Sequence, residues 1–272
     1  MERDISTRIF GKAVKLNMGT KVEAITNVLK ELGGVATLDQ IYNNIEKFYP
    51  AAKSSREWKA GIRGVINREL GHNRNFKRIG LGIYALKEYV EEPKPTMREK
   101  ERMHPYIEGI CLTIGKYKGF HVYTPDKFAL FKDKIFLKDL VTLPDVPPFT
   151  YPEIIEIIKK VDVIWFNKEG FQFPVYALEV VDSINTLSEA LNRCLQLLYF
   201  NTNFLIIGPP HYRKKVLAKL EKEPYLQFKE RFDYKDYDLV IQLYESSVRQ
   251  DKLEEEFFRH SIGGGKLCVQ SL

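Results

Sequence analysis

Val161-Asp162-Val163-Ile164-Trp165-Phe166 and, after a turn, Tyr176-Ala177-Leu178-Glu179-Val180-Val181 are the segments that decide the fold of the second half of this chain. Both are apolar runs of strand length, and the tight turn between them predicts an antiparallel pair. Asp162 stands near the start of the first strand, and Glu179 lies inside the second. Burying an acid between apolar neighbours is expensive unless it has a partner, so the pair favours a shared cation over two solvated carboxylates.

These two acids have the chemistry of a divalent-metal site. Mg²⁺ takes oxygen ligands and keeps several waters, so two carboxylates and one backbone carbonyl suffice to hold it. We predict Asp162, Glu179 and the carbonyl of Val180 as ligands of Mg²⁺. Such a site suits phosphodiester hydrolysis, which needs a water of lowered pKa and a cation that stabilises negative charge on the phosphate.

The segments around this pair predict an α/β domain with a central mixed sheet. The expected elements are, in order, a helix over 104–115, a strand over 119–123, a helix over 151–160, strands over 161–166 and 171–181, a helix over 187–200, a strand over 203–208 and a helix over 209–222. Glu108 lies near the middle of the first helix, where it is either a surface carboxylate or a ligand that flanks the site. Arg193 either faces the phosphate or is an ordinary polar helix position.

A linker divides the chain. The stretch from Glu91 to Lys100 contains two prolines and flanking charges that cannot be buried, which favours irregular structure. We therefore expect a two-domain α+β protein, with domains at 1–91 and 104–272 and a linker at 92–103.

Residues before the linker predict three helices followed by a β-hairpin. Helical spacing of apolar residues marks the first helix, Thr37 is suited to cap the second, and Ser54 or Ser55 the third. This order predicts a winged helix-turn-helix, whose third helix enters the DNA major groove and whose hairpin lies beside the phosphates. The expected DNA contacts are Arg56, Lys59, Arg63, Asn67, Lys77 and Arg78. A helical domain that binds proteins is the alternative.

The charge distribution agrees with a DNA-contacting first domain. Residues 1–103 contain 20 Lys and Arg against 13 Asp and Glu, whereas the remainder contains 22 against 23. A basic surface adds sequence-independent affinity for DNA, because each neutralised phosphate releases counterions. A solvated basic surface without a nucleic-acid partner is the alternative.

Composition excludes several other classes of protein. We find no apolar run long enough for a membrane span and no signal peptide, and expect a cytoplasmic protein. Cys111, Cys194 and Cys268 are far apart, so neither a disulfide framework nor a zinc site is expected.

Both halves resemble known families. The segment Phe76-Lys77-Arg78-Ile79-Gly80-Leu81-Gly82-Ile83-Tyr84-Ala85-Leu86 resembles the wing of the HARE type of winged helix at every fixed position. Residues 104 to about 245 resemble the PD-(D/E)XK nucleases, in particular a subset of restriction enzymes. The matching motifs are His104 at the start of the first helix, Asp162 to Trp165, Glu179-Val180-Val181-Asp182-Ser183 and Leu191-Asn192-Arg193.

This resemblance implies a function for the whole chain. It implies a type II restriction endonuclease that cuts double-stranded DNA at a specific sequence with Mg²⁺. It also implies a homodimer, and a cognate DNA methyltransferase in the same system. The catalytic residues would be Asp162, Glu179, Glu108 and Arg193.

The chain departs from the nuclease family at Val181. Most members carry Lys there, which orients and activates the attacking water, and an apolar side chain cannot do this. The charge could come from Lys159, Lys160 or Lys168, whereas Asp182 could reach the site only if a bulge re-aims it. Two alternative functions stay open: a DNA-binding regulator or accessory protein with a catalytically lost nuclease fold, and a structure-specific repair nuclease.

Overall fold

Caps and glycines shape the N-terminal half of the computed structural model, which describes residues 19–258. Gly33 and Gly34 have φ angles of 85° and 100°, so they end the first helix in a turn that other residues rarely adopt. The elements are α1 (Lys21–Glu31), β1 (Val35–Thr37), α2 (Leu38–Asn44), α3 (Trp58–Gly71), β2 (Phe76–Gly80) and β3 (Ile83–Leu86). The three strands form an antiparallel sheet in the order β1-β3-β2.

One of the two predicted helix caps is confirmed. Thr37 caps α2 in a capping box with Gln40. The prediction that Ser54 or Ser55 caps α3 is wrong, because the N-cap position is Glu57. Ser54 Oγ instead donates a hydrogen bond to a backbone carbonyl of the 3₁₀ turn that precedes the helix.

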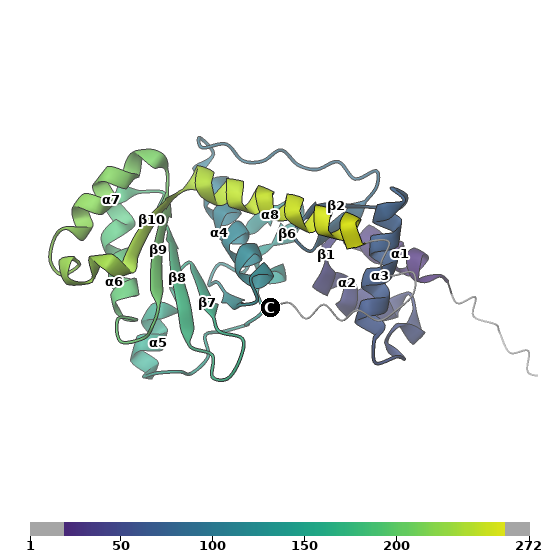
Figure 1. Cartoon of the computed structure of the whole chain (residues 1–272), viewed down its shortest axis with the longest axis horizontal. Helices are drawn as coiled ribbons and strands as arrows, with labels where there is room; N and C mark the ends of the chain where they lie inside the picture. Colours follow the sequence, from purple (N-terminus) through teal and green to yellow (C-terminus); the bar gives the residue numbers. More distant parts are fainter. Residues whose placement is uncertain (1–18, 259–272) are drawn as a thin grey trace, which may run out of the picture.

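The second half of the chain forms a mixed sheet of five strands (Figure 1). The helices and strands of this half of the chain are α4 (Lys100–Tyr117), β4 (His121–Tyr123), β5 (Leu130–Lys132), β6 (Ile135–Phe136), α5 (Pro152–Ile158), β7 (Val163–Phe166), β8 (Pro174–Val180), α6 (Leu187–Leu195), β9 (Asn203–Gly208), α7 (Arg213–Leu220), β10 (Phe232–Asp236) and α8 (Tyr237–Phe258). The strand order is β10-β9-β8-β7-β4. β4, β7 and β8 are antiparallel neighbours, whereas β8, β9 and β10 are parallel.

The predicted mixed sheet is confirmed, but several elements are shorter than predicted: β8 spans Pro174–Val180 rather than 171–181, and α6 ends at Leu195 rather than at residue 200. Other details differ as well. Helix α4 begins at Lys100, so its first turn lies inside the expected linker of 92–103. The hairpin β5–β6 and the pair β10 and α8 were not predicted. Residues 1–18 and 259–272, which include Cys268 and the outer ends of both predicted domains, lie outside the described residues.

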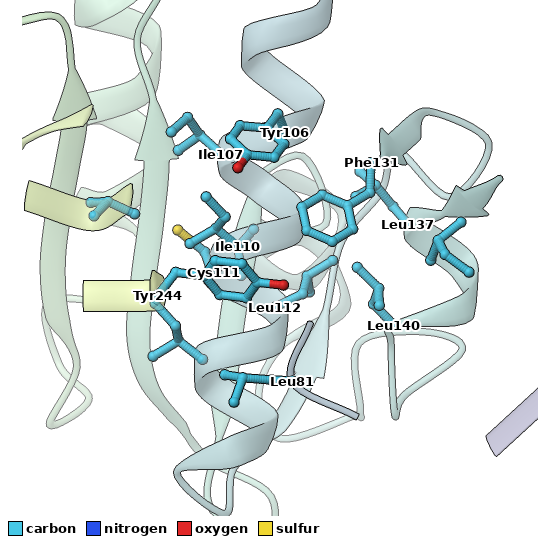
Figure 2. Packing of buried hydrophobic residues seen from close by; sticks show 14 of the residues in the cluster. Leu81, Tyr106, Ile107, Ile110, Cys111, Leu112, Phe131, Leu137, Leu140 and Tyr244 are labelled. Atoms are coloured by element: carbon cyan, nitrogen blue, oxygen red, sulfur yellow. The ribbon is translucent and has the colours of Figure 1, made fainter. Parts of the chain in front are cut away.

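Helices cover both faces of the sheet (Figure 1). On one face, α4 and α8 pack their buried side chains, such as Ile107, Ile110 and Tyr244, into one apolar core (Figure 2). On the other face, α5, α6 and α7 form a second core. No helix within residues 19–258 is both long and apolar enough to cross a membrane.

The N-terminal hairpin belongs to the same core as α4 and α8. Ile79, Leu81 and Ile83 of this hairpin are buried in that core, and Figure 2 shows Leu81 beside α4. Lys132 Nζ donates to the carbonyl of Ile79 at 2.6 Å. The boundary predicted from the sequence therefore cuts across this core, whereas α1, α2 and α3 form a core of their own around Ile25, Ile41 and Ile66.

Candidate metal centre

Asp162 and Glu179 lie together at one end of the antiparallel pair, as the sequence predicts. The register pairs Val163 of β7 with Leu178 of β8, which places Asp162 beside Glu179. Asp162 Oδ2 accepts a hydrogen bond of 2.7 Å from the backbone N–H of Val180. An extended residue presents its N–H and its carbonyl to the same side, so the Val180 carbonyl also faces this end of β7.

Glu179 is held by a guanidinium group. Its side chain is fully buried, and Arg193 of α6 donates to both carboxylate oxygens, at 2.7 and 2.5 Å. Burial raises the pKa of Glu179 to about 8; Arg193 opposes the rise and Asp162 adds to it. Because both oxygens are bonded to Arg193, Glu179 is a poorer candidate for a metal ligand than the sequence suggested.

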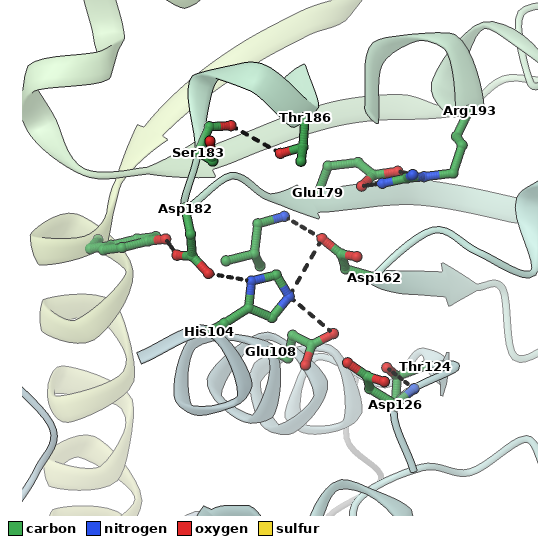
Figure 3. Close-up of polar contacts among 12 residues, drawn as sticks. His104, Glu108, Thr124, Asp126, Asp162, Glu179, Asp182, Ser183, Thr186 and Arg193 are labelled. Carbon is green, nitrogen blue, oxygen red and sulfur yellow. Dashed lines mark hydrogen bonds and ion pairs between the residues drawn. The ribbon is translucent and has the colours of Figure 1, made fainter. Parts of the chain in front are cut away.

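Helix α4 brings a further carboxylate and an imidazole to the same place (Figure 3). His104 and Glu108 are one helical turn apart on one face of α4. His104 Nε2 lies 3.8 Å from Glu108 Oε1 and 3.9 Å from Asp162 Oδ2. The three residues therefore face one common space between α4 and the start of β7.

Glu108 is a buried acid rather than a surface carboxylate. Its side chain is 0% exposed, and neither carboxylate oxygen has a hydrogen-bond partner among the described residues. Burial raises the pKa of Glu108 well above its ordinary value, and His104 partly opposes the rise. The spacing of Glu108 from Cys111, an inward residue of the predicted helix, already indicates an inward position.

The sequence predicted that Asp182 could reach the site only through a bulge in its strand. This prediction is wrong, because Asp182 reaches the site without a bulge. Strand β8 ends at Val180, so Asp182 has left the strand and turns toward α4. Its Oδ2 is 2.7 Å from His104 Nδ1, and its Oδ1 accepts a hydrogen bond from the hydroxyl of Tyr237. Burial opposes the protonation of His104, but Asp182, Glu108 and Asp162 outweigh it and raise the pKa of His104 to about 9.

Val181 stands where the nucleases that the chain resembles usually carry lysine, and here it belongs to the apolar core. Val181 is 1% exposed and packs in the second apolar core. Of the lysines considered as replacements, Lys159 is paired with Asp145 and Glu156, and Lys168 lies in the turn at the far end of β7. Lys160 is exposed beside the end of α5.

Arg193 supplies positive charge beside Glu179, and His104 adds an imidazole next to Asp162 and Glu108. Sequence reasoning assigned Arg193 to the site but named His104 only as a family motif, and it did not assign Tyr237 at all. The spacing of His104 and Glu108 on one helix face was the available signal.

One atom each from His104, Glu108 and Asp162 lies within 4.8 Å of the others, a separation at which they could hold one ion. The buried carboxylate of Glu108 supports a cation there, because neither of its oxygens is hydrogen-bonded within the described residues and its ion pair with His104 spans 3.8 Å. Two carboxylates and the Val180 carbonyl also satisfy the preference of Mg²⁺ for oxygen ligands.

The predicted DNA contacts fall into two groups. Arg56, Lys59 and Arg63 are exposed at or near the start of α3, and the Lys59 ammonium lies 5.4 Å from the centre of the Tyr42 ring. Arg63 also donates to the Tyr42 hydroxyl at 3.1 Å. These residues form an accessible basic face, which we call the α3 face.

The remaining predicted contacts are less accessible. Asn67 is half-buried, and Lys77 is half-buried with its ammonium 3.7 Å from Glu91. Arg78 is buried, ion-paired with Asp251 of α8, and donates to the Tyr84 hydroxyl. In this conformation Arg78 therefore stabilises the fold rather than facing DNA.

Comparison of the chain with protein-family models and with curated protein sequences finds no match. The proposal of a function therefore depends on the geometry of the site and on the sequence motifs.

Proposed function

We propose that this protein is a Mg²⁺-dependent endodeoxyribonuclease of the type II restriction class, with an N-terminal winged helix joined to a nuclease-like domain. The single observation that carries the proposal is the buried Glu108, which faces Asp162 and His104 at the end of a mixed sheet and whose carboxylate has no hydrogen-bond partner among the described residues. An acid in this state is unfavourable for folding, so it is better explained by cation binding than by stability.

The residues of the site would have two separate roles, binding the cation and binding the phosphate. Asp162 and Glu108 would hold the ion, which supplies Lewis acidity and lowers the pKa of a bound water. Glu179 fixes Arg193, whose remaining N–H groups can donate to a phosphate oxygen. Arg56 and Lys59 of the α3 face would contact the DNA backbone.

Digestion of plasmid DNA in the presence of Mg²⁺ tests this function. Discrete fragments are expected from the wild-type protein and from Asp145→Asn, a control at an exposed acid away from the site. Asp162→Asn should give no fragments, since it removes a ligand charge. Full cleavage by Asp162→Asn would overturn the assignment of the site, and cleavage only of branched or damaged DNA would favour a repair nuclease.

A DNA-binding protein without cleavage is the second candidate. The burial of Val181 and the engagement of Glu179 by Arg193 favour it, because both depart from the arrangement typical of active nucleases. Site-specific binding to DNA that stays intact with Mg²⁺ would support this candidate.

The partners follow from the proposed class. We propose a homodimer on double-stranded DNA, because enzymes that cut both strands of a symmetric site match its two-fold symmetry. A cognate methyltransferase would protect host DNA. Sedimentation of the protein with and without a cleaved DNA site measures the oligomeric state, and a monomer in both conditions would contradict the dimer.

A further inference from the structure

The candidate site contains an imidazole in addition to oxygen ligands. We propose that His104 Nε2, Glu108 and Asp162 bind the cation together, and that the imidazole makes the site bind a first-row transition ion such as Mn²⁺ more tightly than Mg²⁺. This inference deepens the proposed function and rests on it only in placing the divalent cation at this site.

The two separations from His104 Nε2 fit a shared ion. Ligand atoms that bind one ion at about 2.1 Å lie at most about 4 Å apart. His104 Nε2 is 3.8 Å from Glu108 Oε1 and 3.9 Å from Asp162 Oδ2. These separations are too long for direct hydrogen bonds but lie within the range of ion pairs, so the three atoms face one common space.

The imidazole is oriented by groups behind it (Figure 3). Asp182 Oδ2 is 2.7 Å from His104 Nδ1, which leaves Nε2 directed at the two carboxylates. Asp182 itself is held by the hydroxyl of Tyr237, and its backbone carbonyl accepts from the hydroxyl of Tyr212 at 3.3 Å. A carboxylate behind a histidine is the usual way in which proteins fix a histidine ligand and raise its basicity.

The second carboxylate of the set is Glu108 rather than the predicted Glu179. Arg193 bonds both oxygens of Glu179, whereas the two oxygens of Glu108 have no hydrogen-bond partner among the described residues although the side chain is 0% exposed. The missing hydrogen bond to Glu108 and the direction of His104 Nε2 lead to the same space.

The nitrogen ligand determines which ion is preferred. Mg²⁺ favours oxygen ligands in near-ideal octahedral geometry and gives up its waters reluctantly. Imidazole suits the first-row transition ions better than it suits Mg²⁺. A set of one imidazole and two carboxylates therefore gives a transition ion an interaction that Mg²⁺ uses poorly.

Calorimetric titration of the full chain with Mn²⁺ and with Mg²⁺, without DNA, tests the inference. Wild-type protein should bind Mn²⁺ at least about tenfold more tightly than Mg²⁺. His104→Gln should lose most of this difference, and Asp182→Asn, which keeps all three ligands, should weaken Mn²⁺ binding by about 10- to 100-fold. The control His72→Gln, at an exposed histidine that follows α3, should match the wild type.

Two results would overturn the inference: equal wild-type affinity for the two ions, or unchanged Mn²⁺ affinity in His104→Gln. Circular dichroism checks folding, and Asp182→Asn decides the matter if His104→Gln does not fold. If the protein binds Mn²⁺ through His104 but cuts no DNA, this inference holds and the proposed nuclease function fails. If the protein cuts DNA but its affinity for the cation does not depend on His104, the nuclease function holds and only this inference fails.

Discussion

Glu108 is the residue at which stability and function are opposed. A fully buried carboxylate without a hydrogen-bond partner destabilises the fold, because it has left water and gained only an ion pair of 3.8 Å with His104 in exchange. Proteins keep such groups where activity requires them, so replacement should improve stability and remove function.

Glu108→Met should therefore raise the free energy of unfolding of the metal-free protein by about 1–3 kcal/mol, since it removes an unsatisfied buried group of similar length. The same change should abolish binding of Mn²⁺. Urea unfolding and calorimetry measure the two effects. Glu69 of α3 is the control, because it is also buried but accepts a hydrogen bond from Asn75 at 2.7 Å. Glu69→Met should lose about 1 kcal/mol, and a similar loss at Glu108 would mark it as structural.

Tyr106 makes the stability of the fold sensitive to alkaline pH. It is 2% exposed on α4 and stacks on Phe131 at 5.6 Å between ring centres. Burial, with a smaller contribution from Glu245, raises the pKa of Tyr106 to about 12 from its ordinary value of about 10. Because the folded state holds the proton more tightly, its stabilising effect is complete below about pH 10 and is lost as the pH rises to about 12.

Tyr106→Phe should therefore reduce the loss of stability between about pH 9 and about pH 11, by an amount on the order of 1 kcal/mol. Urea unfolding at the two pH values gives the comparison. Tyr199→Phe is the control, because Tyr199 is fully exposed. A decline in stability as steep in Tyr106→Phe as in the wild type would contradict the assignment.

At the scale of elements, the α3 face is the surface at which the proposed binding of DNA can be tested. Its exposed lysine and arginines are expected to neutralise DNA phosphates, so removing one of these charges should lower the slope of log affinity against log salt by about 1. Lys59→Ala should show this reduction in titrations of duplex DNA at several salt concentrations. Lys168→Ala, in the exposed turn after β7, is the matched control. An unchanged slope in Lys59→Ala would place the DNA elsewhere.

Local patterns predicted some elements and missed others for identifiable reasons. The strands β7 and β8 and the positions of Asp162 and Glu179 follow from apolar runs and a turn, both of which are local. β10 could not be found in this way, because its residues 232–236 include three charged side chains and its parallel pairing with β9 is a distant contact. The spacing of Glu108 from Cys111 indicates its inward position, but its lack of a hydrogen-bond partner among the described residues depends on how α4 packs against the sheet.

At the scale of the molecule, the hairpin β2–β3 has a different role from the one that the wing pattern predicts. Its side chains at Ile79, Leu81 and Ile83 lie in the core formed by α4 and α8, and Arg78 is paired with Asp251. The motif of fixed glycines describes the hairpin correctly, but sequence alone does not say what a hairpin packs against. The shared core predicts that the α3 face and the candidate metal centre keep a fixed relation to each other.

The two tryptophans of the chain test this relation, because Trp58 lies in α3 and Trp165 in β7. Trp58→Phe and Trp165→Phe leave one fluorescent reporter in each half, and one cooperative unit should give coincident urea transitions. Leu81→Ala, which empties a site in the shared core, should lower the stability seen by both reporters equally, by about 2–5 kcal/mol. Phe128→Ala, at a side chain that is 80% exposed, should change neither. Separate transitions, or a loss seen by one reporter alone, would mean that the halves unfold independently and that the hairpin does not fix the α3 face relative to the metal centre.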